Sequence, residues 1–265
     1  VFATGAAGTR TVNVQETDFI DNSIGMRVKG LDNARFVNNT VLTGGVSKIG
    51  YLNPNVDRPY QFGYHSDNAT GFEIEQNVFE ARSGNIEPVA GINIVESKTA
   101  ANEVYKNTFK QNDMAQKFDH LNRNPNSLRN FIGLQFLCNT FENSSNASSD
   151  VEVNKRTSGS TSNNDGIRKV QGYSLPDASA GNVFSSATST EGHLRNNSVQ
   201  TITYQHHGGN SEPTSTTPIW VNKTQKTAAT CPPKYWQSSG GVVLPNGIVG
   251  QYYTIRSEYN NLLYN

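Results

Sequence analysis

The chain has 265 residues, 22 basic and 22 acidic, so its formal net charge is zero. A neutral chain offers no electrostatic attraction to nucleic acid or to an anionic membrane, and neither is expected as a partner. No apolar run approaches the roughly 20 residues that a membrane-spanning helix needs. Only 34% of the residues are hydrophobic and 17% are charged, which suits a repeat protein with a thin core and many polar turns.

A short motif, Asn-x-Phe or Asn-x-Val, recurs along the chain. Its asparagines are Asn39, Asn77, Asn107, Asn139 and Asn182. Self-similarity at a period of about 20 to 50 residues is typical of stacked repeat architectures. We expect these asparagines to form a ladder, in which each amide hydrogen-bonds to its neighbours and to the turn backbone. The Phe or Val of each motif is expected to stack inside the coil.

Short alternating runs lie upstream of the motif. Met26 and Val28 alternate with polar residues, as do Ile92 and Ile94, and this period of two indicates strands with one buried face. Together the patterns predict an all-β fold, a right-handed parallel β-helix of about seven irregular coils with a C-terminal capping segment. A β-sandwich needs no such motif, and propeller blades are longer and more regular.

The predicted coils occupy residues 1–198, with loops near 45–60, 110–130 and 142–164. The last loop surrounds a candidate strand at residues 151–153. Residues 199–232 are expected to form closing strands, because the open end of a solenoid exposes unpaired strand edges. Residues 233–265 form an extension without a helix-capping signal, and we expect the chain to continue from it into a further region.

The two cysteines are Cys138, directly before Asn139, and Cys231, past the last coil. A disulfide between them is expected, which implies an oxidising compartment; two buried free thiols are the alternative. We expect no metal site, since two cysteines without nearby histidines do not complete a ligand set. No phosphate-binding or dinucleotide motif is present, so no cofactor is expected.

Two sets of predicted outward positions are candidates for a catalytic surface. The first follows the upstream glycines and contains Arg27, His65, Asn93 and Gln135, without a carboxylate. A calcium-dependent polysaccharide lyase needs several acidic ligands on adjacent coils, so this set argues against one.

The second set contains Arg35, Glu73 and Glu103, each one residue before a buried apolar position. Neighbouring coils lie about 4.8 Å apart, close to the roughly 5 Å between the carboxylates of a retaining glycosidase. Catalysis by Glu73 and Glu103, with Arg35 beside them, is therefore one hypothesis. An exposed ladder of charges with little energetic value is the other.

Tyrosines cluster in and beside the first predicted loop, at Tyr51, Tyr60 and Tyr64. Exposed tyrosines next to Asn and Asp would stack on sugar rings and form a carbohydrate-binding face. Alternatively, they pack the loop onto the coils.

The segment Gly133-Leu134-Gln135-Phe136-Leu137-Cys138-Asn139-Thr140-Phe141 resembles a group of secreted right-handed parallel β-helix proteins of Bacteroidota. The later segments Ala180–Phe184 and Thr230–Pro232 extend the resemblance. It implies a large surface or exported protein of which this chain is a fragment, in a family whose members often carry a type IX secretion sorting domain. The resemblance implies no catalytic residues.

These observations favour a non-enzymatic, extracellular or cell-surface module, adhesin-like or structural. It would present loops to a glycan or to another surface protein, as part of a larger chain or assembly. A carbohydrate-active enzyme, either a glycoside hydrolase or a polysaccharide lyase, is the alternative function. A pure spacer is the third.

Overall fold

The computed structural model describes residues 1–5, 12–44, 61–84, 88–125, 132–143, 149–156, 164–173, 177–186, 192–214 and 221–234. The chain divides into two compact units, Val1–Pro233 and Lys234–Asn265. The first unit is built from short β-strands, and within the described ranges its single helical element is a 3₁₀ turn at Gly209–Ser211.

Three long sheets and two short ones contain the strands. Sheet A consists of β1 (Phe2–Thr4), β4 (Ile24–Lys29), β7 (Gln61–Asp67), β10 (Val89–Val95), β13 (Met114–Asp119), β17 (Ser149–Asn154) and β20 (Leu194–Asn197). Sheet B consists of β2 (Asn13–Gln15), β5 (Arg35–Val37), β8 (Glu73–Glu75), β11 (Asn102–Tyr105) and β15 (Leu134–Leu137). Sheet C consists of β3 (Asp18–Asn22), β6 (Thr40–Thr43), β9 (Val78–Ala81), β12 (Thr108–Lys110) and β16 (Thr140–Glu142). The short sheets pair β14 (Leu121–Asn122) with β18 (Gly166–Ile167), and β19 (Val170–Gln171) with β21 (Ile202–His206) and β22 (Val221–Gln225).

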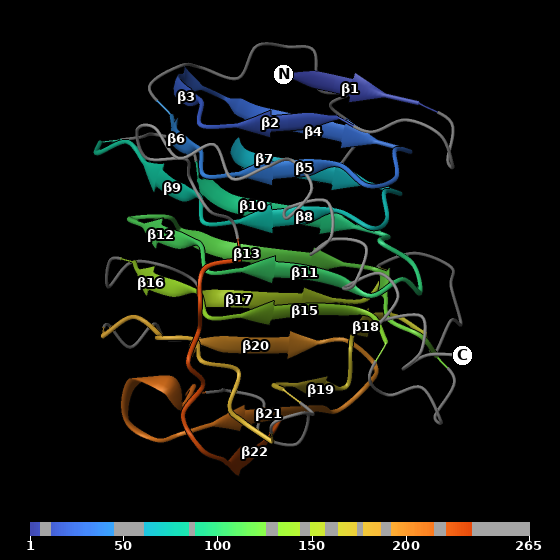
Figure 1. Ribbon diagram of the computed structural model, residues 1–265, viewed down its shortest axis with the longest axis vertical. Helices are drawn as coiled ribbons and strands as arrows, with labels where there is room; N and C mark the ends of the chain where they lie inside the picture. Colours follow the sequence, from blue (N-terminus) through green and yellow to red (C-terminus); the bar gives the residue numbers. More distant parts are fainter. Residues whose placement is uncertain are drawn as a thin grey trace, which may run out of the picture. The chain divides into compact units, whose positions relative to one another are not determined.

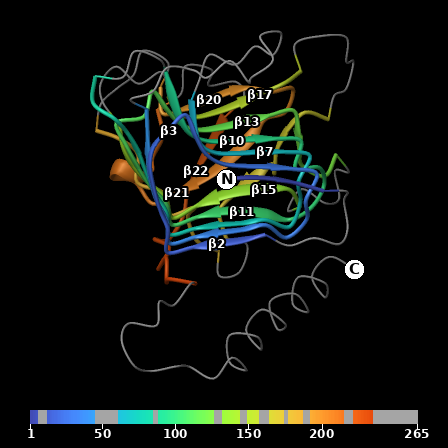
Figure 2. The same ribbon diagram turned by 90° about the horizontal axis from the view of Figure 1, so that it is seen from above.

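The predicted parallel β-helix is confirmed. Every pairing between named strands is parallel, and within each long sheet a strand pairs with its equivalents one coil before and one coil after. Figure 1 shows the coils stacked in sequence order from β1 to β22. Seen from above, sheets A and B lie opposite each other with sheet C at one side, and they enclose a continuous interior (Figure 2). We call this stack of coils the column.

A sharp turn joins sheet B to sheet C in each coil. The residue before each motif asparagine has a left-handed backbone, with φ between 54° and 70° at Asn38, Gln76, Lys106, Cys138 and Gly181. This conformation turns the chain within one residue. The backbone N–H of the asparagine that follows then points along the column toward the next coil. The side-chain oxygen of the asparagine in the next coil accepts a hydrogen bond from that N–H. The asparagine therefore satisfies the backbone donor that the turn leaves unpaired.

The five motif asparagines form one buried ladder of amides inside the column. Side-chain bonds run from Asn39 to Asn77 (3.0 Å), then to Asn107 (2.9 Å), Asn139 (3.2 Å) and Asn182 (3.1 Å). Each Oδ1 of the four lower rungs also accepts the backbone N–H of the asparagine above it, at 2.8–3.0 Å. Each Nδ2 reaches a carbonyl of the neighbouring sheet B strand. The ladder therefore satisfies the polar groups of every turn it passes.

The aromatic residues of the motif stack beside the amides. Phe79, Phe109, Phe141 and Phe184 have successive ring centroids 5.3–5.4 Å apart and nearly parallel planes. His193 continues the stack, 5.4 Å from Phe184. Sheet A approaches this stack through glycines: a Cβ on Gly63 would lie 2.5 Å from the Phe79 ring, and one on Gly91 would lie 2.6 Å from Phe109. At these two positions a glycine precedes the inward residue because the ring occupies the space of a side chain.

One predicted boundary needs correction. The predicted loop at 110–130 contains β13 and β14, and β13 is a full member of sheet A. Its sequence, Met114–Asp119, buries Met, Ala, Gln and Phe, so it lacks the simple alternation of a strand. Within 142–164, the candidate strand at 151–153 is confirmed as part of β17. The closing residues 199–232 supply β21 and β22, which add parallel strands to the column.

Candidate functional site

The outer face of sheet B carries the candidate carboxylates. Glu73 lies directly between Arg35 and Glu103 in the strand register, and Glu103 is followed by Gln135. Arg35 Nε lies 2.8 Å from Glu73 Oε2, and their side chains are 27% and 19% exposed. The predicted adjacency of these three residues is therefore present, and we call Arg35, Glu73, Glu103 and Gln135 the glutamate column.

Chemically, the glutamate column holds two carboxylates on strands whose backbones are about 4.8 Å apart. One oxygen of Glu73 is already engaged by a guanidinium, and a partly exposed ion pair of this kind contributes little to stability. Beyond Glu103 the glutamate column ends in the amide of Gln135. This amide bonds to the Arg168 guanidinium and donates to Gly172 O at 2.9 Å. In register order, the glutamate column therefore consists of one cation, two carboxylates and one amide.

The position of Gln135 corrects an expectation from the sequence. The sequence pattern aligns Gln135 with Arg27, His65 and Asn93, and these three residues do lie on adjacent strands of sheet A. Gln135 instead lies on sheet B opposite Glu103, because the short segment before Asn139 forms β15. The equivalent sheet A residue beyond Asn93 is Lys117, followed by Glu152. Glu152 lies 3.8 Å from Arg195, so this face also ends in an ion pair.

The expectation that Tyr64 lies exposed on a sugar-binding face is wrong. Its side chain is 0% exposed and its ring lies 5.4 Å from that of Phe36, inside the column. The alternation of β7 points Tyr64 inward with Ile92 and Met26 of neighbouring coils. Tyr51 and Tyr60 lie outside the residues that the structure describes.

Two other tyrosines lie beside the glutamate column. Tyr105 is next to Leu137 in the outward register of sheet B, and Tyr173 approaches from the loop after β19. The pKa of Tyr173 is raised, first by burial and then by the nearby Tyr105, Glu103 and Glu75. The Tyr173 phenol therefore stays protonated, and the Tyr105 hydroxyl donates a hydrogen bond to Pro232 O. The sequence does not indicate Tyr105 and Tyr173 as site residues, since neither tyrosine recurs at the equivalent position of other coils.

The predicted disulfide between Cys138 and Cys231 is confirmed, and it closes a loop with a sequence separation of 93. The segment Thr227–Pro233, which we call the strap, leaves β22 and rises along the outside of the column (Figure 1). It touches one coil after another: Ser179 N donates to Thr227 O, Cys231 binds Cys138, and Tyr105 Oη donates to Pro232 O at 2.6 Å. The disulfide thus ties the end of the first unit to earlier coils.

A buried acid–base cluster lies where sheet C meets β17. Asp150, 2% exposed, accepts hydrogen bonds from Asn143 Nδ2 (2.7 Å), Ser185 N (3.0 Å) and Ser185 Oγ (3.0 Å). His193, also buried, is its titratable neighbour, and its Nδ1 accepts from Thr214 N. Ser185 donates to the acid and not to the imidazole, so the three residues do not form a nucleophilic triad. Asp150 and His193 lie 43 positions apart and belong to no repeated motif, so the sequence does not indicate this cluster.

Asp150 makes the stability of the fold pH-dependent. Burial raises its pKa, and the hydrogen bonds from Ser185 and Asn143 and the charge of His193 offset this in part. Native Asp150 therefore binds its proton more tightly than in the unfolded chain, so its contribution to stability falls as the pH rises above about 4. We expect the stability of Asp150→Asn relative to the natural protein to improve as the pH rises from about 4 to 6, as measured by urea unfolding. A relative stability of Asp150→Asn that is the same at every pH would contradict this.

Comparison with known proteins found no matching family model, no similar characterised protein and no similar solved structure. Among the residues that the structure describes, no helix has the length and apolar character needed to cross a membrane. Nor do three or more His, Cys, Asp or Glu side chains converge as a metal-binding group within these ranges.

Proposed function

We propose that this chain is a non-enzymatic module of an extracellular or cell-surface protein, adhesin-like or structural, that presents loops on a rigid β-helix to a glycan or another surface protein. The supporting observation is the Arg35–Glu73 ion pair, because it engages one of the two glutamates that lie in register on adjacent strands of sheet B. The disulfide favours an oxidising compartment, and the amide ladder provides a stiff scaffold for recognition. The resemblance to secreted β-helix proteins of Bacteroidota points the same way.

A carbohydrate-active enzyme is the second candidate. The observation in its favour is the direct register of Glu73 with Glu103. In a retaining glycosidase, one carboxylate attacks the sugar and the other protonates the leaving oxygen, at a separation of about 5 Å. Arg35 would then orient Glu73, and the tyrosines beside the column would contact the sugar.

A glycan array and a panel of polysaccharide hydrolysis and lyase assays distinguish the two functions. We expect saturable binding of a glycan without release of reducing ends or unsaturated products, and equal binding by Glu73→Gln. The matched control is Glu80→Gln, a partly exposed carboxylate on sheet C, outside the glutamate column. Turnover that is lost in Glu73→Gln and Glu103→Gln but retained in Glu80→Gln would overturn the proposal and establish the enzyme.

A further inference from the structure

The strap lies on the surface of the column. None of its residues is buried, and Thr227, Ala228, Thr230 and Pro232 are exposed. Lys106 Nζ donates to Cys231 O at 2.8 Å, and Ala229 N donates to Ser179 Oγ at 3.2 Å. By contrast, the paired strands of the sheets, the amide ladder and the aromatic stack include no strap residue, and the strap adds one isolated parallel bridge between Thr227 and Ala178. The strap is therefore a peripheral element attached to an independent core.

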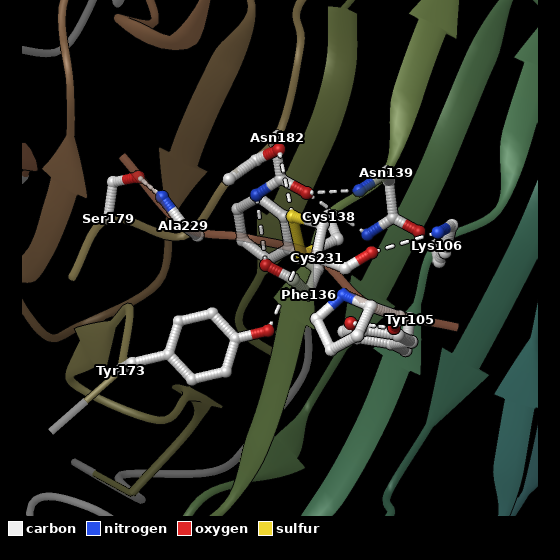
Figure 3. Close-up of a disulfide and its surroundings, with 12 residues drawn as sticks. Tyr105, Lys106, Phe136, Cys138, Asn139, Tyr173, Ser179, Asn182, Ala229 and Cys231 are labelled. Carbon is white, nitrogen blue, oxygen red and sulfur yellow. Dashed lines mark hydrogen bonds between the residues drawn. A yellow bond between two sulfur atoms is a disulfide. The ribbon is translucent and has the colours of Figure 1, made fainter. Parts of the chain in front are cut away.

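The two sulfur atoms of the disulfide differ in their surroundings (Figure 3). Cys138 is 6% exposed at the turn between sheets B and C, whereas Cys231 is partly exposed on the strap. Tyr173 Oη lies 3.4 Å from Cys138 Sγ. A disulfide sulfur carries no proton, so a hydrogen bond in this contact is donated by the hydroxyl, which also hydrogen-bonds Tyr105. The backbone of Gly181 makes room for the bond, because a Cβ there would lie 2.5 Å from Cys231 Sγ.

We propose that the Cys138–Cys231 disulfide is a latch that a dithiol reductant opens while the column stays folded, with Cys231 as the sulfur attacked and Cys138 as the leaving group. The thiolate of the dithiol forms a bond to Cys231 Sγ, the Cys138–Cys231 bond breaks, and its electron pair goes to Cys138. The second thiol then displaces Cys231, so the protein disulfide is reduced to two thiols and the dithiol is oxidised to its own disulfide.

Tyr173 has a defined role in this step. Its hydroxyl points at the sulfur that becomes a thiolate, and a hydrogen bond to that thiolate stabilises the leaving group. Burial raises the pKa of Tyr173, which keeps the hydroxyl protonated and able to donate. Once the bond is open, the strap is free to leave the outer face, and the phenol of Tyr105 loses its bond to Pro232 O. The latch thus controls access to the tyrosines beside the glutamate column.

The rate of reduction by dithiothreitol, followed by alkylation and intact mass, tests the latch. We expect the natural protein to be reduced in native buffer with unchanged far-ultraviolet circular dichroism, and hydrogen exchange to increase in the strap but not in sheets A, B and C. Tyr173→Phe should slow reduction about three- to tenfold, the effect of one hydrogen bond. The control Tyr64→Phe, which removes a buried hydroxyl without a hydrogen-bond partner, should leave the rate unchanged.

A monothiol such as glutathione identifies the attacked sulfur. The mixed disulfide, mapped by peptide mass spectrometry, is expected on Cys231, with Cys138 alkylated. Three outcomes would overturn the proposal: a mixed disulfide on Cys138, an unchanged rate in Tyr173→Phe, or reduction that proceeds only at the rate of global unfolding. The last of these would show that the strap is part of the folded core.

Discussion

Asn107→Ala is expected to lower the free energy of unfolding by about 3–5 kcal/mol. Asn107 is the central rung of the amide ladder and is 1% exposed. Its Oδ1 accepts both the backbone N–H and the side-chain amide of Asn77, each at 2.9 Å, and its Nδ2 donates to Ile74 O at 3.0 Å. Truncation leaves the buried N–H of Asn77 without a partner and opens a cavity, so desolvation and packing losses add.

Urea unfolding, followed by circular dichroism, measures this loss. The matched control is Asn222→Ala, on an exposed position of β22, which should change stability by less than about 0.5 kcal/mol. If Asn107→Ala cost no more than the control, the ladder would be a consequence of coil stacking and not a source of its stability. A cost that also appears in Asn139→Ala would show that each rung contributes separately.

Removal of the disulfide in the double variant Cys138→Ala and Cys231→Ala is expected to cost about 4–5 kcal/mol. The bond closes a loop with a sequence separation of 93, and a loop of this size strongly restricts the unfolded chain. The native column should change little, because the strap lies on its surface. We therefore expect a lower denaturant midpoint with the same native circular dichroism at 25 °C.

The control for this prediction is chemical. The natural protein unfolded in the presence of a dithiol should have the same midpoint as the double variant, since both lack the covalent loop. A loss below about 1 kcal/mol would contradict the expected restriction of the unfolded chain, because it would require that chain to remain compact around the two sites. A larger loss in the variant than in the reduced protein would instead reveal packing by the Cys138 sulfur in the folded state.

Much of the fold follows from the sequence because the coils repeat. Asn39 and its four equivalents share one backbone environment, and Phe36, Ile74, Val104 and Phe136 follow one another in the sheet B register, as their spacing predicts. The adjacency of Glu73 and Glu103 follows from the same alignment. In a solenoid, a residue three positions before the motif has the same neighbours in every coil, so sequence alignment is equivalent to strand register.

The alignment fails where coils differ in length. The pattern of a glycine followed by alternating residues aligns Gln135 with the sheet A residues, but the segment before Asn139 is too short to contain a sheet A strand and forms β15 of sheet B. The corresponding sheet A strand is β13, which lies earlier in the chain and has no regular alternation. Of the two roles considered for Tyr64, the structure excludes exposure on a sugar-binding face, because the strand face on which a residue lies, and not the neighbouring loop, decides whether it is buried.

The sequence by itself determined the stacking of the coils and the inward positions, because each depends on local repetition and on the period of two along a strand. Cysteine positions also indicated the disulfide. Only the tertiary structure decided which outer surfaces meet: the strap over Tyr105, Tyr173 beside Cys138, and Asp150 with His193. These contacts join segments from different coils through single side chains, and no periodic signal in the sequence specifies them.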